Sequence, residues 1–278
     1  MMPSRGYLLC CIERTGSNLL CNALAGTGVA GWPIEYFNPV TQDKPKMLGI
    51  LGESNMVDGL PKILMAGTTP NGVFGAKIHF GHFRRLGMNI VGKKGFSPDG
   101  LLKAQTPALL PKPVALELLR SRLSDLAPQL AAYELMRSLV PDLRIIWLRR
   151  RNMLARAISH YRARKSGLWH QPASNSGLPG QEQPLEFDLG QIHNLHCVGQ
   201  FEEEMWQRFF QERNISPYCL VYEEFIANYE STVRGVLEFL DVAGEKTFIP
   251  PPRSLKQSDG ISQEWENRYH KLSAEAGL

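Results

Sequence analysis

A loop near the start of the chain contains the residue types that bind an anion. It follows a continuous apolar run, Tyr7–Ile12, and precedes a helix-forming segment that begins at Ser17. Free backbone N–H groups at a helix N-terminus attract anions, hydroxyl groups add hydrogen-bond donors, and an arginine neutralises charge. The alternative interpretation is an ordinary glycine-containing turn before a capped helix. The predicted anion-binding residues are Arg14, Thr15, Gly16, Ser17 and Asn18.

This loop differs from the phosphate-binding motif GxxxxGKS/T, because the lysine of that motif is missing. An acidic Mg²⁺-binding residue after a strand is not evident either. CxxC and HExxH patterns of metal ligands are also absent from the sequence. The sequence therefore predicts anion binding without a metal ion.

A second basic segment lies in the middle of the chain. The apolar run Leu143–Leu148 ends in three arginines, Arg149–Arg151, and Ser159 follows on the next predicted helix. In open α/β sheets, ligands bind outside the carboxyl ends of the strands, so arginines at that position favour an anionic partner. A solvated basic turn is the alternative. Together with the first loop, this segment predicts two anion sites.

Composition limits the function classes. The chain has 278 residues, 43% of them hydrophobic and 21% charged, which is typical of a globular protein and fits one domain. Its net charge of +4 suits a polyanionic small molecule and is too small to predict nucleic-acid binding. Five cysteines without regular spacing predict reduced thiols. No targeting signal or membrane-spanning run is predicted, so we expect a cytoplasmic protein.

Strand-like and helix-like segments alternate along the chain, which predicts an α/β fold with a mainly parallel central sheet flanked by helices. The expected strands are Tyr7–Ile12, Val73–Phe80, Leu143–Leu148 and Pro217–Tyr222. The expected helices are Ser17–Ala25, Leu126–Leu139, Leu154–Lys165, Gln191–Phe210, Thr232–Leu240 and Ser262–Lys271. Residues 39–72 and 166–190 are predicted to be irregular loops, and residues 252–278 a polar tail.

With both basic segments in view, the chain resembles the trehalose 2-sulfotransferase family of bacteria. The segments that carry the resemblance are Glu13–Leu20, Gly28–Phe37, Thr69–Lys77 and Arg149–Arg164, with weaker support from Val221–Glu223 and Ser262–Tyr269. The resemblance implies one sulfotransferase domain over residues 1–278, with a fold like that of P-loop nucleotide kinases. It also implies 3′-phosphoadenosine 5′-phosphosulfate (PAPS) as the donor and a hydroxyl of a carbohydrate, glycolipid or other small molecule as the acceptor.

The resemblance also implies roles for the donor-binding residues. The first loop would hold the 5′-phosphosulfate, and Ser159 with either Arg150 or Arg151 would hold the 3′-phosphate. The spacing of eight residues to Ser159 favours Arg151. The tail is expected on or near the donor site, where Lys256 is a candidate for closing over the 3′-phosphate.

Three residues are candidates for the chemistry. Glu35 matches the family's catalytic glutamate, and its aromatic neighbours are expected to raise its pKa. Lys77 is expected to stabilise the bridging oxygen as the donor's phosphate leaves. His79, on the same face of a predicted strand as Lys77, is the alternative base.

Acceptor binding is expected from Glu13 and the segment around the catalytic glutamate. The family has a Gln at the position of Glu13 and an acidic residue at the position of Trp32. Both departures count against trehalose itself as the acceptor. The expected acceptor-binding residues are Glu13, Trp32, Pro33, Ile34, Tyr36 and Phe37. The alternative function is a P-loop-type nucleotide-binding protein or kinase without sulfuryl transfer. The sequence leaves a homodimer open.

Overall fold

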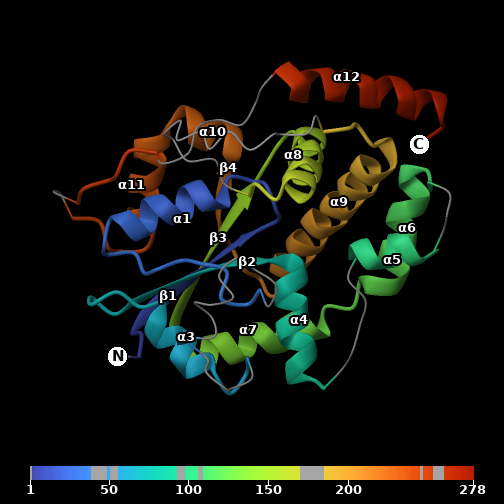
Figure 1. The fold of residues 1–278 in the computed structure, drawn as a ribbon. Coiled ribbons are helices and arrows are strands. Elements are labelled where there is room, and N and C mark those ends of the chain that lie inside the picture. The colour runs from blue at the N-terminus through green and yellow to red at the C-terminus, as the bar shows by residue number, and fades with distance from the viewer. Residues whose placement is uncertain are drawn as a thin grey trace.

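Four parallel strands form the central sheet of the computed structural model (Figure 1). The structure describes residues 2–38, 49–50, 56–92, 98–105, 109–169, 185–244, 247–252 and 260–278. The strands are β1 (Arg5–Cys11), β2 (Val73–His79), β3 (Asp142–Arg149) and β4 (Tyr218–Val221), in the order β2-β1-β3-β4. This confirms the predicted α/β class and the parallel sheet.

The strand register brings the carboxyl ends of all four strands to one edge of the sheet. Cys11 of β1 pairs with His79 of β2, and Arg149 of β3 pairs with Val221 of β4. The chain leaves β1 toward β2 on one side and later returns to β3 on the other. Such a switch point is where open parallel sheets bind ligands.

Helices cover both faces of the sheet because β1 is apolar on both. Leu8 and Cys10 face one cluster of buried residues, which includes side chains of α4 (Phe80–Ile90), α6 (Lys112–Leu123), α7 (Ala127–Leu139) and α9 (Leu189–Glu212). Leu9 and Cys11 face the other, with α1 (Ser17–Gly26) and α11 (Tyr229–Phe239). This alternation is the period of two expected of a strand buried on both faces.

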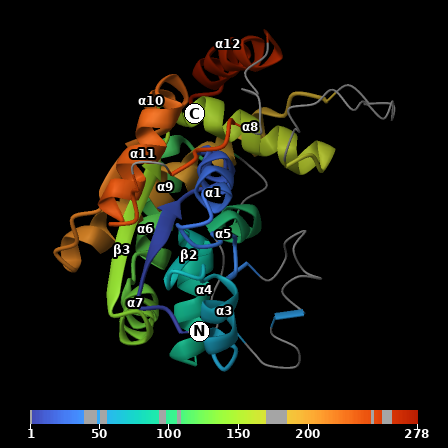
Figure 2. The ribbon, with the colours of Figure 1, turned by 90° about the vertical axis from the view of Figure 1, so that its left-hand side faces the viewer.

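The C-terminal helix α12 (Gly260–Glu275) lies beside α8 (Met153–Ser166), as both Figure 1 and Figure 2 show. Trp265 and Tyr269 of α12 are buried in a cluster with Tyr161 of α8. Arg162 of α8 also donates a hydrogen bond of 2.9 Å to Ser262 Oγ. The tail is therefore packed against the helix that carries Ser159.

Each strand and helix expected from the sequence is present, with ends shifted by a few residues. The helices α4 and α6 were not anticipated, nor were three shorter ones: α3 (Leu60–Ala66), α5 (Pro98–Gln105) and α10 (Tyr222–Ala227). The expectation that residues 39–72 are irregular is wrong for α3, which buries only a few side chains and so shows little periodicity. α4 begins directly after β2, without a capping side chain to signal its start. Among the described residues, no helix is long and apolar enough to span a membrane.

Gly31 provides a test of how closely the segment after α1 packs against β2. Its φ of +70° favours glycine, and a Cβ there would lie 2.4 Å from the backbone nitrogen of Gly75 in β2. Gly28 has a similar φ of +72° but has no atom within 4 Å of the Cβ position. We expect Gly31→Ala to lower the free energy of unfolding by about 2–4 kcal/mol, and Gly28→Ala by only about 1–2 kcal/mol. Urea denaturation measures both; equal losses would contradict the close approach of the two segments.

Candidate active site

The loop after β1 has the strained backbone that its sequence requires. Arg14 has a φ of +68° and Gly16, the residue before α1, a φ of +83°. A Cβ on Gly16 would lie 2.4 Å from the ring of Tyr222, so only glycine fits beneath that ring. Thr15 Oγ1 donates a hydrogen bond of 2.9 Å to the Ile12 carbonyl, which closes the turn. No side chain caps the N-terminus of α1, and its first turn has no acidic residue.

The two predicted anion sites adjoin one another. Arg14 Nε donates to Ser159 Oγ at 3.0 Å, and its Nη1 donates to the Trp169 carbonyl at 2.7 Å. Arg150 Nη1 donates to the carbonyl of Arg14 at 3.0 Å. The ends of β1 and β3 and the helix α8 therefore meet at one place, as a single ligand with two anionic groups would need.

The contacts distinguish the two candidate arginines. The Arg150 guanidinium lies over the Tyr222 ring, 4.8 Å from its centroid, and its side chain is only 16% exposed. The Arg151 side chain is 65% exposed and forms an ion pair with Glu224 on the outer surface. The spacing to Ser159 points to Arg151, but these contacts place Arg150 against the loop. The backbone bends at Arg151, and the N–H of this residue donates a hydrogen bond of 3.0 Å to Glu223 Oε2.

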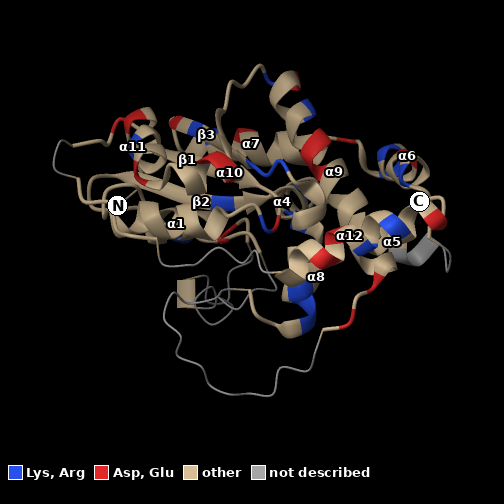
Figure 3. Ribbon diagram, turned by 90° about the horizontal axis from the view of Figure 1, so that it is seen from above, with Lys and Arg blue, Asp and Glu red and all other residues tan. Residues whose placement is uncertain are grey.

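Positive charge is concentrated where the loop and the end of β3 meet. Burial and the neighbouring Arg150 lower the pKa of Arg14 to about 10, and burial lowers the pKa of Arg150. With a pKa of about 10, Arg14 remains protonated at neutral pH. Figure 3 also shows a band of Lys and Arg on α8, which includes Arg164 and Lys165 in its last turn. An anion bound between Arg14 and Arg150 would reduce their mutual repulsion.

Lys77 is the centre of a second group of polar side chains. It is 4% exposed, and its Nζ lies 2.5 Å from Glu35 Oε1. The same ammonium donates to the side-chain carbonyl of Asn18 in α1. Glu35 Oε2 accepts a further hydrogen bond of 2.8 Å from Asn38. The predicted donor loop and the predicted catalytic residues are therefore joined through Lys77.

His79 lies between two carboxylates. Its Nε2 is 3.8 Å from Glu35 Oε1, and its Nδ1 is 3.6 Å from Glu13 Oε1. Burial raises the pKa of Glu13, but the nearby imidazoles, led by that of His79, outweigh it and lower this pKa to about 2. Both candidate bases, Glu35 and His79, are thus within one cluster.

The expectation that Glu35 has a raised pKa is wrong for this structure. Burial does raise it, but the neighbouring His79 and the Lys77 ammonium outweigh burial, and the pKa of Glu35 lies well below its usual range. In turn, Glu35 outweighs the effect of burial on Lys77 and raises its pKa. The sequence neighbours of Glu35 suggested an apolar setting, whereas in space its carboxylate lies 2.5 Å from the Lys77 ammonium.

The expected acceptor-binding segment is mostly buried. Tyr36 and Phe37 are 1% and 2% exposed and pack in the apolar core. Pro33 is also buried, and Ile34 forms an isolated bridge to β2. Only Trp32, 42% exposed, offers a large surface to solvent. The structure therefore leaves Trp32 exposed and Glu13 and Ile34 partly exposed, while the other members of this set are buried.

Several residues of the site were missed from the sequence. Asn38 orients Glu35, and Arg156 of α8, 1% exposed, donates to the carbonyls of Glu13 and Leu195. A Cβ on Gly199 of α9 would lie 2.0 Å from the Arg156 guanidinium, so glycine makes the space for it. These contacts join segments that are distant in the sequence, so no local sequence pattern predicts them. Lys256 and its expected role lie outside the described residues.

Comparison with known proteins identifies the family. The family model described as Stf0 sulphotransferase matches residues 6–90 and 112–272. The chain belongs to the Stf0 sulphotransferase family. The protein is therefore a sulfotransferase, and the resemblance predicted from the motifs is confirmed. This favours sulfuryl transfer over the alternative of a kinase.

Two curated relatives and two solved structures are similar to this chain. Trehalose 2-sulfotransferase of Mycolicibacterium smegmatis is 26% identical over 98% of this chain and 97% of its own length. That of Mycobacterium tuberculosis is 24% identical over 99% and 97%. A sulfotransferase from Alicyclobacillus acidocaldarius superposes with a TM-score of 0.46 at 12% identity, covering 99% and 94% of the two chains. The sulfotransferase domain of the Synechococcus PCC 7002 olefin synthase gives a TM-score of 0.42 at 16% identity, covering 95% and 83%.

The depressed pKa of Glu35 predicts how stability depends on pH. Because the folded-state pKa lies below the unfolded value of about 4.5, the carboxylate stabilises the fold above that pH and loses its contribution as pH falls through the folded value. We expect the free energy of unfolding to fall more steeply below about pH 5 in the native protein than in Glu35→Gln. Urea denaturation at a series of pH values measures this slope. Glu117→Gln, at a side chain 74% exposed, is the control and should leave the slope unchanged; a native slope in Glu35→Gln would contradict the assignment.

Proposed function

We propose that this sulfotransferase moves a sulfuryl group from PAPS to a hydroxyl of a carbohydrate. The observation that carries the proposal is the meeting of Arg14, Ser159 and Arg150 at one edge of the sheet, with both polar contacts at 3.0 Å. PAPS carries a phosphosulfate at one end of its ribose and a 3′-phosphate on the other side. A protein that binds it needs cations and donors for both groups within one site.

In this proposal the first loop holds the 5′-phosphosulfate. The backbone N–H groups at the start of α1 point to it, and Arg14 balances its charge. Arg150 and Ser159 hold the 3′-phosphate. Ser159 Oγ, which accepts a hydrogen bond from Arg14 in this structure, then donates one to a phosphate oxygen. The adjoining positions of the two arginines, and the close packing of Tyr222 on Gly16, support this division.

The reaction is an in-line displacement at sulfur. A bond forms between the acceptor oxygen and sulfur while the bond from sulfur to the phosphate oxygen breaks, and the acceptor's proton passes to the base. Lys77 stabilises the charge that develops on the departing phosphate oxygen. Glu35 is the proposed base. When Lys77 turns from Glu35 to that oxygen, the carboxylate loses a cation that lowers its pKa, and its basicity rises as the donor binds.

A sugar acceptor is supported by the two relatives, both named trehalose 2-sulfotransferase. The exposed indole of Trp32 is suited to stacking on the apolar face of a sugar ring, and the Glu13 carboxylate accepts hydrogen bonds from hydroxyl groups. A glycolipid has the same headgroup chemistry.

Other features of the proposal come from the sequence. It treats residues 1–278 as one domain, and the packing of α12 on α8 supports a tail close to the donor site. The cytoplasmic location stays a prediction, and the oligomeric state is left open.

Label transfer from radioactive PAPS to the sugar fraction of a bacterial extract tests the function. We expect the native protein to label a hydroxylated product, and Glu35→Gln to lower kcat by about 10²–10⁴-fold with donor affinity retained, because the general base is lost. His79→Ala is the matched variant and should lower kcat by less than about tenfold. The opposite ranking would make His79 the base, and tight PAPS binding without any labelled product would contradict the proposed transfer.

The neighbouring arginines give a matched test of donor binding. Removing Arg150 takes away charge-assisted hydrogen bonds to a phosphate, each worth about 1.5–3 kcal/mol, so Arg150→Ala should weaken binding of 3′-phosphoadenosine 5′-phosphate by about 10–100-fold. Arg151→Ala removes the same charge from the exposed surface and should change the affinity by less than about threefold. Isothermal titration calorimetry measures both affinities. A larger loss in Arg151→Ala would reverse the assignment.

A further inference from the structure

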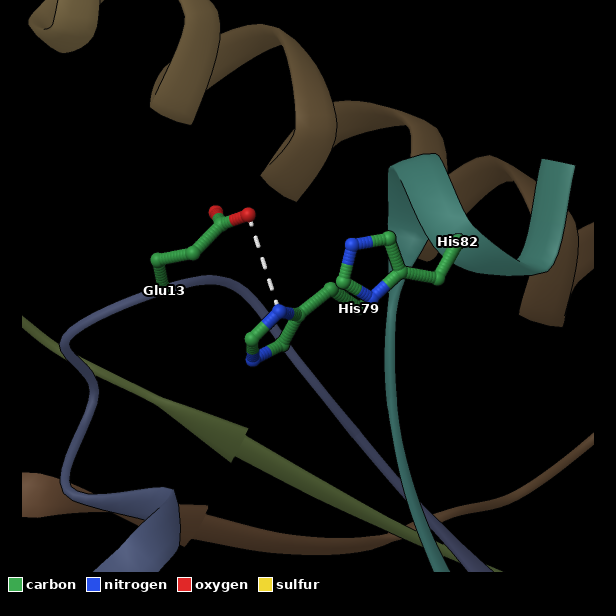
Figure 4. Close-up of side chains that lie close together, drawn as sticks. All are labelled: Glu13, His79 and His82. Atoms are coloured by element: carbon green, nitrogen blue, oxygen red, sulfur yellow. Dashed lines mark ion pairs between the residues drawn. The ribbon is translucent and has the colours of Figure 1, made fainter. Parts of the chain in front are cut away.

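Two histidines and a glutamate gather beside the catalytic cluster (Figure 4). Glu13 follows β1, His79 ends β2, and His82 lies in the first turn of α4. One potential ligand atom from each side chain lies within 4.8 Å of the other two. Glu13 and His79 lie at the ends of β1 and β2, which are neighbours in the sheet, so the buried sheet fixes where their backbones lie.

Three of the imidazole nitrogens in this cluster have no hydrogen-bond partner among the described residues. Both ring nitrogens of His79 and Nδ1 of His82 are buried without a hydrogen bond to any residue that the structure describes. The two rings lie with their centroids 5.2 Å apart. Buried polar atoms are usually satisfied, and exceptions in a cluster of ligating side chains indicate a missing ligand.

The separations suit a small transition-metal ion. Ligands at 2.0–2.1 Å around a tetrahedral zinc ion lie about 3.3 Å from one another. His79 Nδ1 and Glu13 Oε1 are already 3.6 Å apart, and the three ligand atoms lie within 4.8 Å of one another, which is the gap that a bound ion would have to close. Two imidazoles and one carboxylate favour zinc-like ions, whereas Mg²⁺ and Ca²⁺ prefer oxygen ligands throughout.

The opposite side of His79 is also arranged as metal-binding histidines require. Its Nε2 faces Glu35 Oε1 at 3.8 Å, and Glu35 is itself held by Lys77 and Asn38. Histidines that bind a metal through one nitrogen commonly donate the other N–H to a carboxylate, which fixes the tautomer and the ring orientation. Glu35 is placed to accept that hydrogen bond.

We propose that Glu13, His79 and His82 form a binding site for one divalent transition-metal ion of the zinc type, with water at the remaining position. The ion joins the ends of β1 and β2 to the start of α4. It also holds His79 with its N–H directed at Glu35, so that occupancy of the site orients the group next to the proposed base. The site rests on these three side chains: Glu13 offers the ion Oε1, the oxygen that faces His79, and keeps Oε2 to accept a hydrogen bond from the acceptor.

Metal titration of the chelator-treated protein tests the site without PAPS or sugar. Calorimetry with Zn²⁺ is expected to show one ion bound per chain, and Co²⁺ to give the intense visible absorption of a tetrahedral site. Loss of a ligand in His82→Ala or Glu13→Gln should cost more than the ~10–100-fold that loss of an outer hydrogen-bond partner costs. His270→Ala, at an exposed histidine of α12, is the matched control and should bind Zn²⁺ as the native protein does.

Three results would overturn the site: native protein that binds no Zn²⁺ more tightly than the double variant His79→Ala/His82→Ala; unchanged affinity in His82→Ala; or an equal loss in His270→Ala. Thermal unfolding of each apo variant checks that the fold is retained. If a variant does not fold, the Co²⁺ spectrum of the native protein still decides, because a weak octahedral spectrum rejects the arrangement. Failure of sulfuryl transfer would leave these metal measurements unchanged.

Discussion

The buried ammonium of Lys77 is the constraint on which the site depends. A charge 4% exposed is tolerated only when it is paired and hydrogen-bonded. Its partners come from two different segments: Glu35, in the segment that follows α1, and Asn18, in the first turn of α1. Satisfying one cation therefore fixes the positions of β2, the start of α1 and the Glu35 carboxylate relative to one another. The close approach of Gly31 to β2 holds the same segment from the other end.

The second constraint is that the four parallel strands end at the same edge of the sheet. Each strand is followed by residues of the site: Glu13–Gly16 after β1, His79 at the end of β2, Arg150 after β3 and Tyr222 after β4. No single segment could place two arginines, a serine and a carboxylate together with this spacing. Burial lowers the pKa of both arginines, and the charge of Arg150 lowers the pKa of Arg14 further, so a bound anion would stabilise the site.

The fold could be predicted well from the sequence because strands and helices are indicated by patterns within short segments. The apolar run Tyr7–Ile12 and the arginines after Leu148 defined strands and their ends, and the parallel topology then brought the two basic segments together. What could not be predicted were contacts between distant segments. Arg156 is accommodated by Gly199, and Arg150 faces the loop while Arg151 points outward, only because of how α8, α9 and β4 pack. The pKa of Glu35 was misjudged for the same reason: its sequence neighbours are aromatic, but its spatial neighbours are Lys77 and His79.

The low pKa of Glu35 is compatible with a role as base when the free and occupied sites are distinguished. Without a donor, the Lys77 ammonium is paired with the Glu35 carboxylate and hydrogen-bonded to Asn18. A carboxylate paired in this way is a weak base. In the proposed mechanism, a leaving-group oxygen that competes for Lys77 would remove this pairing at the step that needs a base. The ion pair that stabilises the fold would then link donor binding to the basicity of Glu35.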